Sequence, residues 1–364
     1  MKDKNYYAVI MAGGGGTRLW PLSRRKRPKQ LLKLIDDTSM FAMAVNRLRA
    51  IFPVERILVV TVADQTAKLQ KDVPDIPREN YLIEPMPRGT ASVVGLAATR
   101  LQQIAPDATM AVLTADHYIR NLPLFHQLLE AAWETAQDNW LVTLGIHPTF
   151  PATGYGYIQH AEMIQKSQTL AVHRVLKFKE KPDLATAKVM LQSGDHDWNS
   201  GMFIWKVNGI LAEFEKQMPD LYTGLTRIAS ASGTPREEGV IHEVWQALRP
   251  STIDYGIMEN AGSLAVIPAT DLGWDDIGSW ESLFEVLPCD ENGNIFIGCK
   301  PLTLDSNHSL VLSEKSDRKI VTIGMQDAII IDTGDALLVC NRHDAQKVRD
   351  VVKMLGDVEN GKYL

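Results

Sequence analysis

A short apolar run, residues 7–11, passes directly into four consecutive glycines at positions 13–16. An apolar run of this length indicates a buried strand. Glycines carry no side chain, so the backbone N–H groups of such a turn can converge on an anion. In α/β proteins, ligands bind beyond the carboxyl ends of the parallel strands. The feature therefore predicts an α/β chain with an anion-binding loop near its amino end.

The stretch that follows the glycines carries positive charge alone. No acidic residue occurs between Lys4 and Asp36. The basic residues there are Arg18, Arg24, Arg25, Lys26, Arg27, Lys29 and Lys33. The chain as a whole has a formal net charge of −6, so this stretch is a basic island in an acidic protein. It suits a polyphosphate substrate, whereas the overall acidity argues against bulk nucleic-acid binding.

Two other phosphate-binding loops do not match. A Walker A motif ends in Gly-Lys-Ser/Thr and enters a helix, whereas Thr17 and Arg18 follow here and two prolines, Pro21 and Pro28, resist helix formation. A dinucleotide fingerprint requires a third glycine where Leu19 stands. The alternative of a flexible surface loop with solvated charges explains neither the glycine run nor the Pro-Lys pair.

Strand-like and helix-like segments alternate up to about residue 285. Strands are expected at 57–62, 110–114 and 140–146, and helices at 125–135 and after Thr90, which is expected to cap its helix. This order predicts an α/β fold with a mostly parallel sheet flanked by helices. After Pro288, short apolar runs recur and predict a small β-rich domain with a closing helix at 344–355. The predicted domains are 1–288 and 289–364.

The motifs G-G-x-G-T-R-L-x-P-L-S and P-K-Q resemble the opening of the nucleoside-diphosphate-sugar pyrophosphorylases. The W-P-L-S and P-K-Q variants are most similar to the mannose-1-phosphate guanylyltransferase branch. The resemblance runs from residue 7 to about 355. It implies a Rossmann-like mixed sheet and a C-terminal domain built as a short left-handed β-helix, which helps two subunits pair as a homodimer.

The resemblance assigns the nucleotide to the glycine loop and to residues after it. The implied nucleotide-binding residues are Ala12, Gly13, Gly14, Gly15, Gly16, Thr17, Arg18, Lys29, Glu84, Arg88, Thr90 and Asp116. Arg18 and Lys29 would offset the charge of the triphosphate, and together with Lys181 they are the implied catalytic residues. The family motif R-N-T-A-P appears as R-G-T-A-S, so Gly89 and Ser92 depart from the family near the base.

Two aspartates are candidates for a magnesium site. Mg²⁺ takes one or two protein carboxylates together with phosphate oxygens of its substrate. Asp116 follows the strand expected at 110–114, and Asp276 stands in Gly-Trp-Asp-Asp-Ile-Gly. Either residue taken alone is as well explained as a turn or helix-cap residue. The resemblance pairs them as the metal ligands and selects Asp276 rather than Asp275.

The sugar phosphate is assigned to a second group of motifs. Phe178 to Pro182 matches the family's F-x-E-K-P, which implies that Glu180 contacts sugar hydroxyls and Lys181 the phosphate. Neighbouring strand residues face opposite sides, so the strand must break for both to reach one ligand. The resemblance adds Gly154, Tyr155 and Asn199. It assigns the segment from Asp254 to Asn260, whose last residue is a departure from the family's lysine, loosely to the same pocket.

These residues predict Mg²⁺-assisted formation of GDP-mannose and pyrophosphate from GTP and mannose 1-phosphate. Two alternatives remain open: a sister enzyme that uses another nucleotide or hexose 1-phosphate, and a non-catalytic regulator that binds nucleotide sugars. The sequence shows no signal peptide and no apolar stretch as long as a membrane span, and its three cysteines form no metal-binding spacing. A cytoplasmic enzyme without a membrane or nucleic-acid partner is therefore expected.

Overall fold

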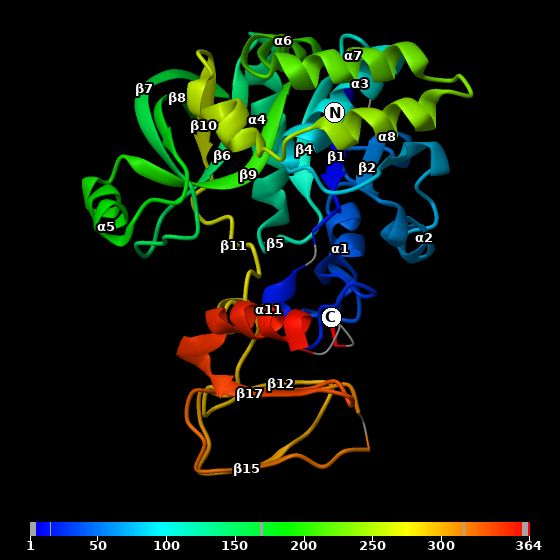
Figure 1. Cartoon of the computed structure of the whole chain (residues 1–364). Helices are drawn as coiled ribbons and strands as arrows, with labels where there is room; N and C mark the ends of the chain where they lie inside the picture. Colours follow the sequence, from blue (N-terminus) through cyan, green and yellow to red (C-terminus); the bar gives the residue numbers. More distant parts are fainter. Residues whose placement is uncertain (1–4, 15, 168–169, 316, 359–362) are drawn as a thin grey trace. The chain divides into compact units, whose positions relative to one another are not determined.

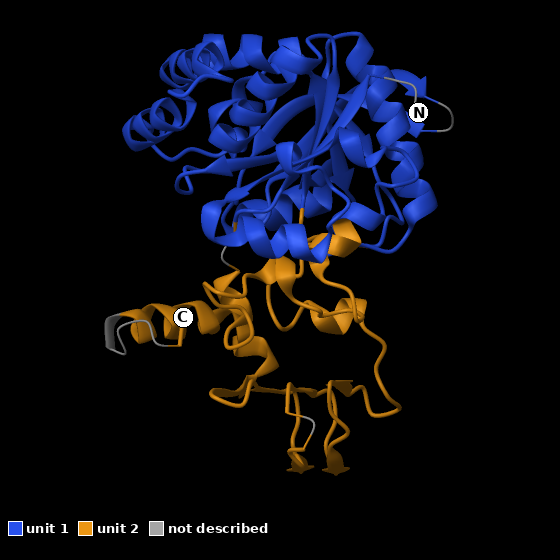
Figure 2. Cartoon of the chain, turned by 90° about the vertical axis from the view of Figure 1, so that its right-hand side faces the viewer, with its two compact units in different colours: residues 1–13, 45–114, 119–273 blue, residues 14–44, 115–118, 274–364 orange. Residues whose placement is uncertain are grey.

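The computed structural model describes residues 5–14, 16–167, 170–315, 317–358 and 363–364. Two compact units make up the chain, and each is assembled from separate stretches of sequence (Figure 2). Unit 1 comprises residues 1–13, 45–114 and 119–273, and unit 2 comprises residues 14–44, 115–118 and 274–364. Residues 274–288 thus fold with the C-terminal residues, although the sequence places a domain boundary after residue 288.

A nine-stranded sheet forms the centre of unit 1, with the order β3-β2-β1-β4-β9-β6-β10-β8-β7 (Figure 1). Its strands are β1 (Tyr6–Met11), β2 (Ile57–Val62), β3 (Tyr81–Glu84), β4 (Thr109–Thr114), β6 (Leu141–Ile146), β7 (Tyr157–Ser167), β8 (Leu170–Lys179), β9 (His196–Lys206) and β10 (Leu264–Pro268). The pairings β1–β2, β1–β4, β2–β3 and β6–β10 are parallel. Within this sheet β8 and β9 run against the other strands, which confirms the prediction of a mostly parallel mixed sheet.

Helices cover both faces of this sheet. Residues of β1 that point to opposite faces therefore pack against different helices. Val9 belongs to a core that it shares with α3 (Thr90–Ile104), α6 (Val207–Gln217) and α7 (Pro219–Ala231). Tyr6 points to the other face, where its hydroxyl donates to the main-chain oxygen of Leu129 in α4 (Leu122–Gln137) at 3.2 Å. The remaining helices of the chain up to residue 260 are α1 (Met40–Asn46), α2 (Ala63–Asp72), α5 (Leu184–Ser193), α8 (Glu237–Ala247), α9 (Ile253–Gly256) and the short 3-10 turns η1 (Thr17–Leu19), η2 (Lys29–Leu31), η3 (Val54–Arg56), η4 (Arg78–Asn80) and η5 (Met258–Asn260).

One local expectation about α3 is wrong. Thr90 is the first residue of the helix, and the residue before it is Gly89, so Thr90 does not cap its own helix. Its hydroxyl instead accepts a hydrogen bond from the main-chain N–H of Ile253, the first residue of α9, at 2.9 Å. A long-range contact within unit 1 has therefore replaced the local cap that the sequence suggested.

The C-terminal part of unit 2 is a stack of short parallel strands (Figure 1). One sheet contains β12 (Ile295–Ile297), β14 (Leu310–Ser313) and β16 (Ala328–Asp332), and a second contains β13 (Leu302–Leu304) and β15 (Val321–Ile323). The chain alternates between the two sheets, as in a solenoid, and we call residues 295–341 the solenoid. It ends with β17 (Leu337–Asn341), which pairs antiparallel with β16, and is followed by η6 (Arg342–Lys347) and α11 (Val348–Val358). The predicted β-rich domain is confirmed; its left-handedness stays a prediction.

The segment that follows the glycines packs into the same hydrophobic core as the solenoid. The core includes Leu19, Trp20, Leu22, Leu32, Leu34, Ile277, Trp280, Ile295, Leu310, Leu312, Ile329, Ile331 and Leu338. The Trp280 indole donates to the main-chain oxygen of Trp20 at 2.9 Å. Unit 2 also contains β11 (Trp274–Asp275), which pairs with β5 (Tyr118–Ile119), and the short helix α10 (Leu283–Val286). No helix in the described ranges is long and apolar enough to cross a membrane.

Candidate functional site

The glycine turn starts from a fixed point at the end of β1. The buried Ala12 donates its N–H to the main-chain oxygen of Val60 in β2 at 2.8 Å, and its own oxygen accepts from the Thr61 hydroxyl at 2.8 Å. Gly14 is exposed, and a β-carbon added there would meet no atom within 4 Å. Gly15 lies outside the described residues. The turn is therefore anchored at its first residue and open at Gly14.

Gly16 brings this turn against Lys29. Its φ of 60° lies in the left-handed region, which glycine tolerates best. A β-carbon at this position would overlap the β-carbon of Lys29 and lie 3.1 Å from the Ser23 hydroxyl. Any larger residue would push the turn away from Lys29, so Gly16 acts by close approach as well as by backbone freedom.

Lys29 is the centre of a charged cluster in unit 2. Its side chain is 7% exposed, and its ammonium lies 2.8 Å from Oδ2 of Asp116. The same ammonium donates to the main-chain oxygen of Asp276. Burial is the largest single influence on the pKa of Asp116 and would raise it, but the charges of Lys29 and His117 together with hydrogen bonds lower the pKa below the usual value. The structure thus brings two predicted residues, Asp116 and Asp276, to the ammonium of a third, Lys29, which lies up to 247 positions away in the sequence.

Asp116 and Asp276, which the sequence predicts to hold a magnesium ion, both contact Lys29. Asp276 Oδ1 accepts from the main-chain N–H of Gly278 at 3.1 Å, which orients its carboxylate. The neighbouring Asp275 has a pKa raised to about 7, by burial and then by the charge of Asp276. No cluster of three or more protein ligands suited to a metal occurs among the residues that the structure describes. Two carboxylates plus phosphate oxygens is the arrangement typical of Mg²⁺ at a nucleotide.

Arg18 and Thr17 lie in η1, immediately after the glycine turn, and both are exposed. Arg18 forms no hydrogen bond or ion pair with any of the described residues, so its guanidinium is available to a ligand. Arg24 and Arg27 differ, because each forms an ion pair with a carboxylate of the same unit, Asp335 and Glu314 respectively. These two arginines of the basic island therefore pair with carboxylates of the protein itself, and a role of the island toward a polyphosphate stays a prediction.

In unit 1, Glu84 ends β3 as a buried carboxyl group. Burial raises its pKa to about 7, although hydrogen bonds from the Trp245 indole (3.3 Å) and the Ser92 hydroxyl (3.4 Å) act in the opposite direction. A β-carbon added to Gly13 would lie 3.6 Å from Oε1 of Glu84, so the start of the glycine turn runs beside this carboxyl group. Ser92, a departure from the family motif, is thus a partner of Glu84 that the sequence did not reveal.

Arg88 and Thr90 hold the segment between β3 and α3. The Arg88 guanidinium donates to the main-chain oxygens of Trp245 at 2.8 Å and Gln246 at 3.3 Å, at the carboxyl end of α8. Cations at this end of a helix also balance its dipole. Arg88 therefore fixes the segment next to Glu84, and direct contact of Arg88 with a nucleotide stays a prediction.

The predicted break after β8 is present. β8 ends at Lys179, and Lys181 has a φ of 44°, which is unusual for a residue other than glycine. The turn brings the Lys181 ammonium into contact with Oε1 of the neighbouring Glu180. Strained backbone of this kind is concentrated at functional sites. A regular strand would direct Glu180 and Lys181 to opposite faces, whereas this turn brings their side chains into contact.

Glu180 has a free acceptor in a buried position. Its side chain is 8% exposed, and its Oε2 has no hydrogen-bond partner among the described residues. A β-carbon on Gly156 would overlap this oxygen and lie 3.3 Å from the β-carbon of Asn199. An unpaired buried carboxylate oxygen is costly, and the space beside it is kept by a glycine. The arrangement is that of an acceptor for an incoming hydroxyl group.

Asn199 is oriented by the residues around it. Its amide nitrogen donates to Oδ1 of Asp254 at 2.8 Å, and its amide oxygen accepts from the main-chain N–H of Gly201 at 3.0 Å. Burial, and then the charge of Glu180, raises the pKa of Asp254 to about 6. The sequence assigned Asp254 to this pocket loosely; the contact with Asn199, 55 positions away, makes its position specific.

Gly154 and Tyr155 lie in the loop before β7. Gly154 is exposed, with no atom within 4 Å of an added β-carbon, and the Tyr155 ring lies 5.1 Å from the ring of Trp198. The structure therefore brings the predicted sugar-side residues into one region of unit 1. The residues predicted for the triphosphate and the metal are gathered in unit 2, apart from Ala12 and Gly13.

Comparisons with known proteins show the family of the chain. A family model described as "Nucleotidyl transferase" matches residues 7–293, and a second, "MannoseP isomerase/GMP-like beta-helix domain", matches residues 300–355. The chain is 36% identical over 363 residues to "Mannose-1-phosphate guanylyltransferase" of Klebsiella pneumoniae, covering 98% of this chain and 75% of that protein. The corresponding protein of Escherichia coli K12 is 35% identical over 364 residues, with coverages of 98% and 74%. A solved structure described as mannose-1-phosphate geranyltransferase from Thermus thermophilus is 31% identical, with a TM-score of 0.87 and coverages of 97% and 99%.

Proposed function

Because this chain belongs to the nucleotidyl transferase family, we propose that it joins GTP and mannose 1-phosphate into GDP-mannose and releases pyrophosphate. The observation that carries the proposal is the contact of the Lys29 ammonium with Asp116 and with the main chain of Asp276. It places a buried cation and two aspartates beside the basic segment that follows the glycines. Similarity over 98% of this chain to proteins named mannose-1-phosphate guanylyltransferase supplies the choice of substrates.

The chemistry requires positioning and charge compensation rather than a general base. A phosphate oxygen of mannose 1-phosphate attacks the α-phosphorus of GTP, a new O–P bond forms, and the bond from the α-phosphorus to the bridging oxygen breaks. The attacking oxygen is already anionic, so no proton has to be removed. Arg18 and Lys29 offset the charge of the triphosphate, and Lys181 holds the sugar phosphate. Charge compensation in a preorganised site is the main source of rate in such transfers.

Asp116 and Asp276 would hold Mg²⁺. When bound, the ion would neutralise charge on the triphosphate oxygens and on the departing pyrophosphate. Lys29 has a structural part in the same place, because it links Oδ2 of Asp116 to the segment that contains Asp276. It thereby holds the Asp116 carboxylate next to the backbone of Asp276.

Glu84 supports guanine as the base. Guanine presents two adjacent N–H donors, at N1 and at its exocyclic amine, and a carboxylate with two oxygens can accept both. Thymine and uracil present a single N–H on that edge. Because the carboxylate form is the one that accepts, and the pKa of Glu84 is about 7, the affinity for GTP should rise as the pH increases through neutrality.

Glu180, Asn199 and Asp254 support a sugar partner. The free Oε2 of Glu180 can accept from a hydroxyl, and Asn199 keeps an amide hydrogen beyond the one that it gives to Asp254. The amide orientation is fixed by the bond from Gly201. Together they form a donor and an acceptor for the hydroxyl groups of a hexose, beside the ammonium of Lys181.

A matrix of substrates tests the proposal. Each of ATP, GTP, CTP, UTP and dTTP is incubated with the 1-phosphates of mannose, glucose, galactose and N-acetylglucosamine and with magnesium. Pyrophosphate release and the mass of the product are measured. We expect the GTP and mannose 1-phosphate pair to react fastest. A dominant reaction of another pair would assign the chain to a sister enzyme. Nucleotide-sugar binding without pyrophosphate from any pair would identify a non-catalytic binding protein.

We also propose that the protein is a homodimer that works in the cytoplasm. On the second solenoid sheet, Leu302 pairs with Val321 and Leu304 with Ile323, and each of these side chains is at least half exposed. An exposed apolar face of this kind commonly marks a subunit contact. The double variant Leu304→Asp/Ile323→Asp should be a monomer by light scattering, and Leu176→Asp on β8 is the matched control. A wild-type monomer would contradict the proposal. The free cysteines Cys289, Cys299 and Cys340 are consistent with a reducing compartment.

A further inference from the structure

The chain that leads to Lys29 contains a tight turn closed by two arginines. The N–H of Arg24 donates to the main-chain oxygen of Arg27 at 3.0 Å, and the N–H of Arg27 donates back to Arg24 at 2.9 Å. Pro28 follows, and Lys29 begins η2. The orientation of this turn, which we call the 24–27 turn, therefore determines where the backbone of Lys29 starts.

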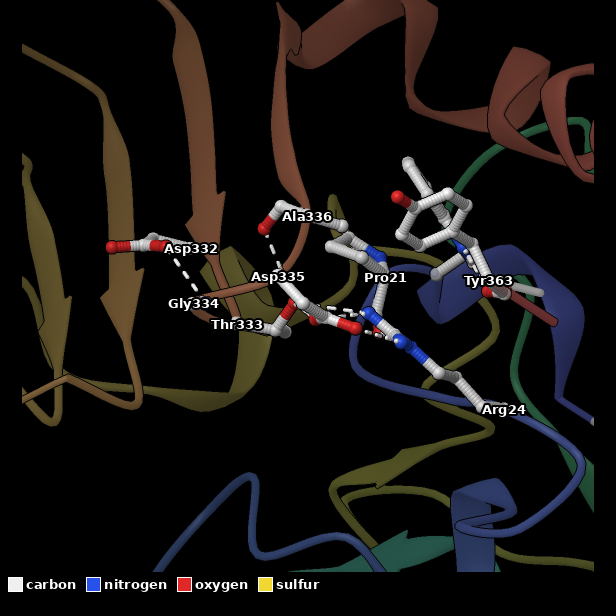
Figure 3. Close-up of polar contacts among 9 residues, drawn as sticks. Pro21, Arg24, Asp332, Thr333, Gly334, Asp335, Ala336 and Tyr363 are labelled. Atoms are coloured by element: carbon white, nitrogen blue, oxygen red, sulfur yellow. Dashed lines mark hydrogen bonds and ion pairs between the residues drawn. The ribbon is translucent and has the colours of Figure 1, made fainter.

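Residues of the connection between β16 and β17 bind the side chain of Arg24, which belongs to the 24–27 turn (Figure 3). Nη1 of Arg24 lies 2.6 Å from Oδ2 of Asp335, and Nη2 lies 2.7 Å from Oδ1, which is a two-point contact with the carboxylate. Nη2 also donates to the Thr333 hydroxyl at 3.1 Å, and Nε donates to the main-chain oxygen of Pro21 at 2.8 Å. All three guanidinium nitrogens are used, so Arg24 joins its own loop to the solenoid.

Local hydrogen bonds shape the β16–β17 connection around Asp335. The Thr333 hydroxyl lies 3.1 Å from Oδ1 of Asp335 and 3.1 Å from the main-chain oxygen of Ala336. The N–H of Gly334 donates to Oδ1 of Asp332 at 2.9 Å (Figure 3). The Arg24 guanidinium holds the pKa of Asp335 at about 2, so the pair is fully ionised at neutral pH. The Thr333 hydroxyl therefore helps to orient the Asp335 carboxylate that binds Arg24.

A second arginine makes a similar connection. Arg27 forms an ion pair with Glu314, which follows β14. The apolar residues that precede the 24–27 turn, Leu19, Trp20 and Leu22, belong to the core that also contains strands of the solenoid. The turn is thus joined to the solenoid by two charge pairs and by the packing of the chain before it.

We propose that the solenoid is a positioning support for Lys29 and that Arg24 is the positioning residue through which it acts. Asp335 fixes Arg24, Arg24 fixes the 24–27 turn, and this turn sets the backbone of Lys29 opposite Asp116 and Asp276. The inference deepens the proposed function and rests on it for its kinetic test. It assigns the C-terminal domain a part in turnover that is separate from any part in subunit pairing.

The first experiment measures kcat, the KM for each substrate and the melting temperature of Arg24→Ala, Asp335→Asn and Arg24→Lys. The Arg24 side chain is 19% exposed and that of Asp335 56%; because ion pairs open to solvent contribute little to folding stability, the melting temperature should fall by no more than a few degrees. Misplacing Lys29 should lower kcat about ten- to a hundredfold, since small displacements of a catalytic group have effects of this size. Arg24→Lys keeps the charge but loses the two-point contact, and it should fall between the wild type and Arg24→Ala.

A matched ion pair in unit 1 supplies the control. Arg49 makes the same two-point contact with Asp75, at 2.5 and 3.0 Å, and both side chains are exposed. Arg49→Ala and Asp75→Asn should leave kcat unchanged. Because a loss of subunit pairing could also alter turnover, the oligomeric state of every variant is measured, and it should equal that of the wild type.

A second readout requires no catalysis. Lys29 is nearly buried, so an amine-acetylating reagent should label it slowly in the wild type, and quantitative mass spectrometry of its peptide gives the rate. Arg24→Ala and Asp335→Asn should increase this rate at least about fivefold. The rate in Arg49→Ala and the labelling of the exposed Lys33 should stay unchanged.

A double variant tests whether Arg24 acts through Lys29. In the Lys29→Ala background, Arg24→Ala should change kcat less than about twofold. Three results would each overturn the inference. They are labelling of Lys29 in Arg24→Ala at the wild-type rate, a wild-type kcat in Arg24→Ala, and a loss of kcat from Arg24→Ala in the Lys29→Ala background as large as in the wild type. Failure of the wild type to form GDP-mannose would instead count against the proposed function and leave the labelling test valid.

Discussion

The charged cluster of unit 2 has a buried ammonium, that of Lys29, at its centre, whereas the cluster of unit 1 has a buried carboxylate, that of Glu180. Lys29 compensates Asp116, whose pKa falls despite its burial. Around Glu180 the acidic groups outnumber the cations: the pKa of Asp254 is raised to about 6, and one oxygen of Glu180 has no partner among the described residues. The difference indicates two kinds of ligand. We expect the cluster centred on a buried cation to bind phosphate together with a metal ion, and the cluster centred on a buried carboxylate with a free acceptor to bind neutral hydroxyl donors.

The largest expected effect comes from removing the balancing cation. Lys29→Ala leaves Asp116 and Asp276 without the ammonium that joins them, and the triphosphate loses a compensating charge. We expect kcat to fall about a thousandfold, the upper range for the loss of one preorganised electrostatic group. Steady-state kinetics with GTP and mannose 1-phosphate measures it. Lys33→Ala, in the same basic island but exposed, is the control and should keep wild-type turnover. A well-folded Lys29→Ala variant with near-normal kcat would remove Lys29 from the mechanism.

The next effect concerns the acidic cluster. Glu180→Gln keeps the shape of the side chain but replaces a charged acceptor with an amide. Because hydrogen bonds to charged groups are stronger than those between neutral groups, we expect the KM for mannose 1-phosphate to rise about ten- to a hundredfold, while the KM for GTP changes little. Glu162→Gln, at an exposed position of β7, is the control. An equal rise of both KM values would show that the two clusters do not divide the substrates as proposed.

Glu84 should give a smaller, pH-dependent effect. Its carboxylate form is required to accept from guanine, and its pKa is about 7. The KM for GTP of the wild type should therefore increase as the pH falls from 8 to 6. Glu84→Gln should raise the KM about tenfold at pH 8 and remove this dependence. Steady-state kinetics with varied GTP across this pH range measures both. A wild-type affinity that is flat over the range, or unchanged in the variant, would exclude Glu84 from base recognition.

The same substitution should have the opposite effect on folding. The pKa of Glu84 is about 7 in the folded protein against an ordinary value of 4.5, so the folded state binds this proton more tightly than the unfolded state. Stability is then lost as the pH rises from about 4.5 to 7, by an amount on the order of 3 kcal/mol. Glu84→Gln cannot ionise, and its free energy of unfolding should exceed that of the wild type at pH 8 but not at pH 4.5. Urea unfolding at both pH values tests this. Equal changes at the two pH values would contradict it.

The smallest expected effect is that of Ser92→Ala. The Ser92 hydroxyl lies 3.4 Å from Glu84 and 2.8 Å from the main-chain oxygen of Gly89, so the first of these bonds is long and weak. Removing it should raise the pKa of Glu84 slightly and shift the pH profile of GTP binding upward, with less than a threefold change in KM at pH 8. A shift of the profile in the other direction would show that Ser92 does not stabilise the carboxylate.

The sequence predicted the parts of this molecule that depend on contiguous residues. Apolar runs located β1, β2 and β4, because a buried strand needs a few consecutive apolar side chains. The break at Lys181 was likewise expected from the demands placed on two neighbouring side chains. The short recurring runs after residue 290 indicated the β-rich domain, although they gave no clear repeat from which its two sheets could be derived.

Long-range partners were not predictable from the residues themselves. Arg18, Arg24 and Arg27 belong to one run of positive charge, yet the partners of Arg24 and Arg27 stand 311 and 287 positions further along the chain. Nothing within the run distinguishes an arginine that meets a carboxylate from one that faces a ligand. Thr90 failed as a cap for the same reason, because its partner, Ile253, comes from a distant segment. The resemblance to a family proposed Asp116 and Asp276 as a metal pair, and the fold brings both residues into contact with Lys29.

The most direct test of the central claim, that the Lys29 cluster drives transfer of the nucleotide to a sugar phosphate, is a paired measurement on one reaction. Wild type and Lys29→Ala are incubated with GTP, mannose 1-phosphate and magnesium, and GDP-mannose and pyrophosphate are quantified together. The account predicts equimolar products from the wild type and an about thousandfold slower, still equimolar, reaction from the folded variant. Absence of GDP-mannose from the wild type, or equal rates from the two proteins, would contradict it.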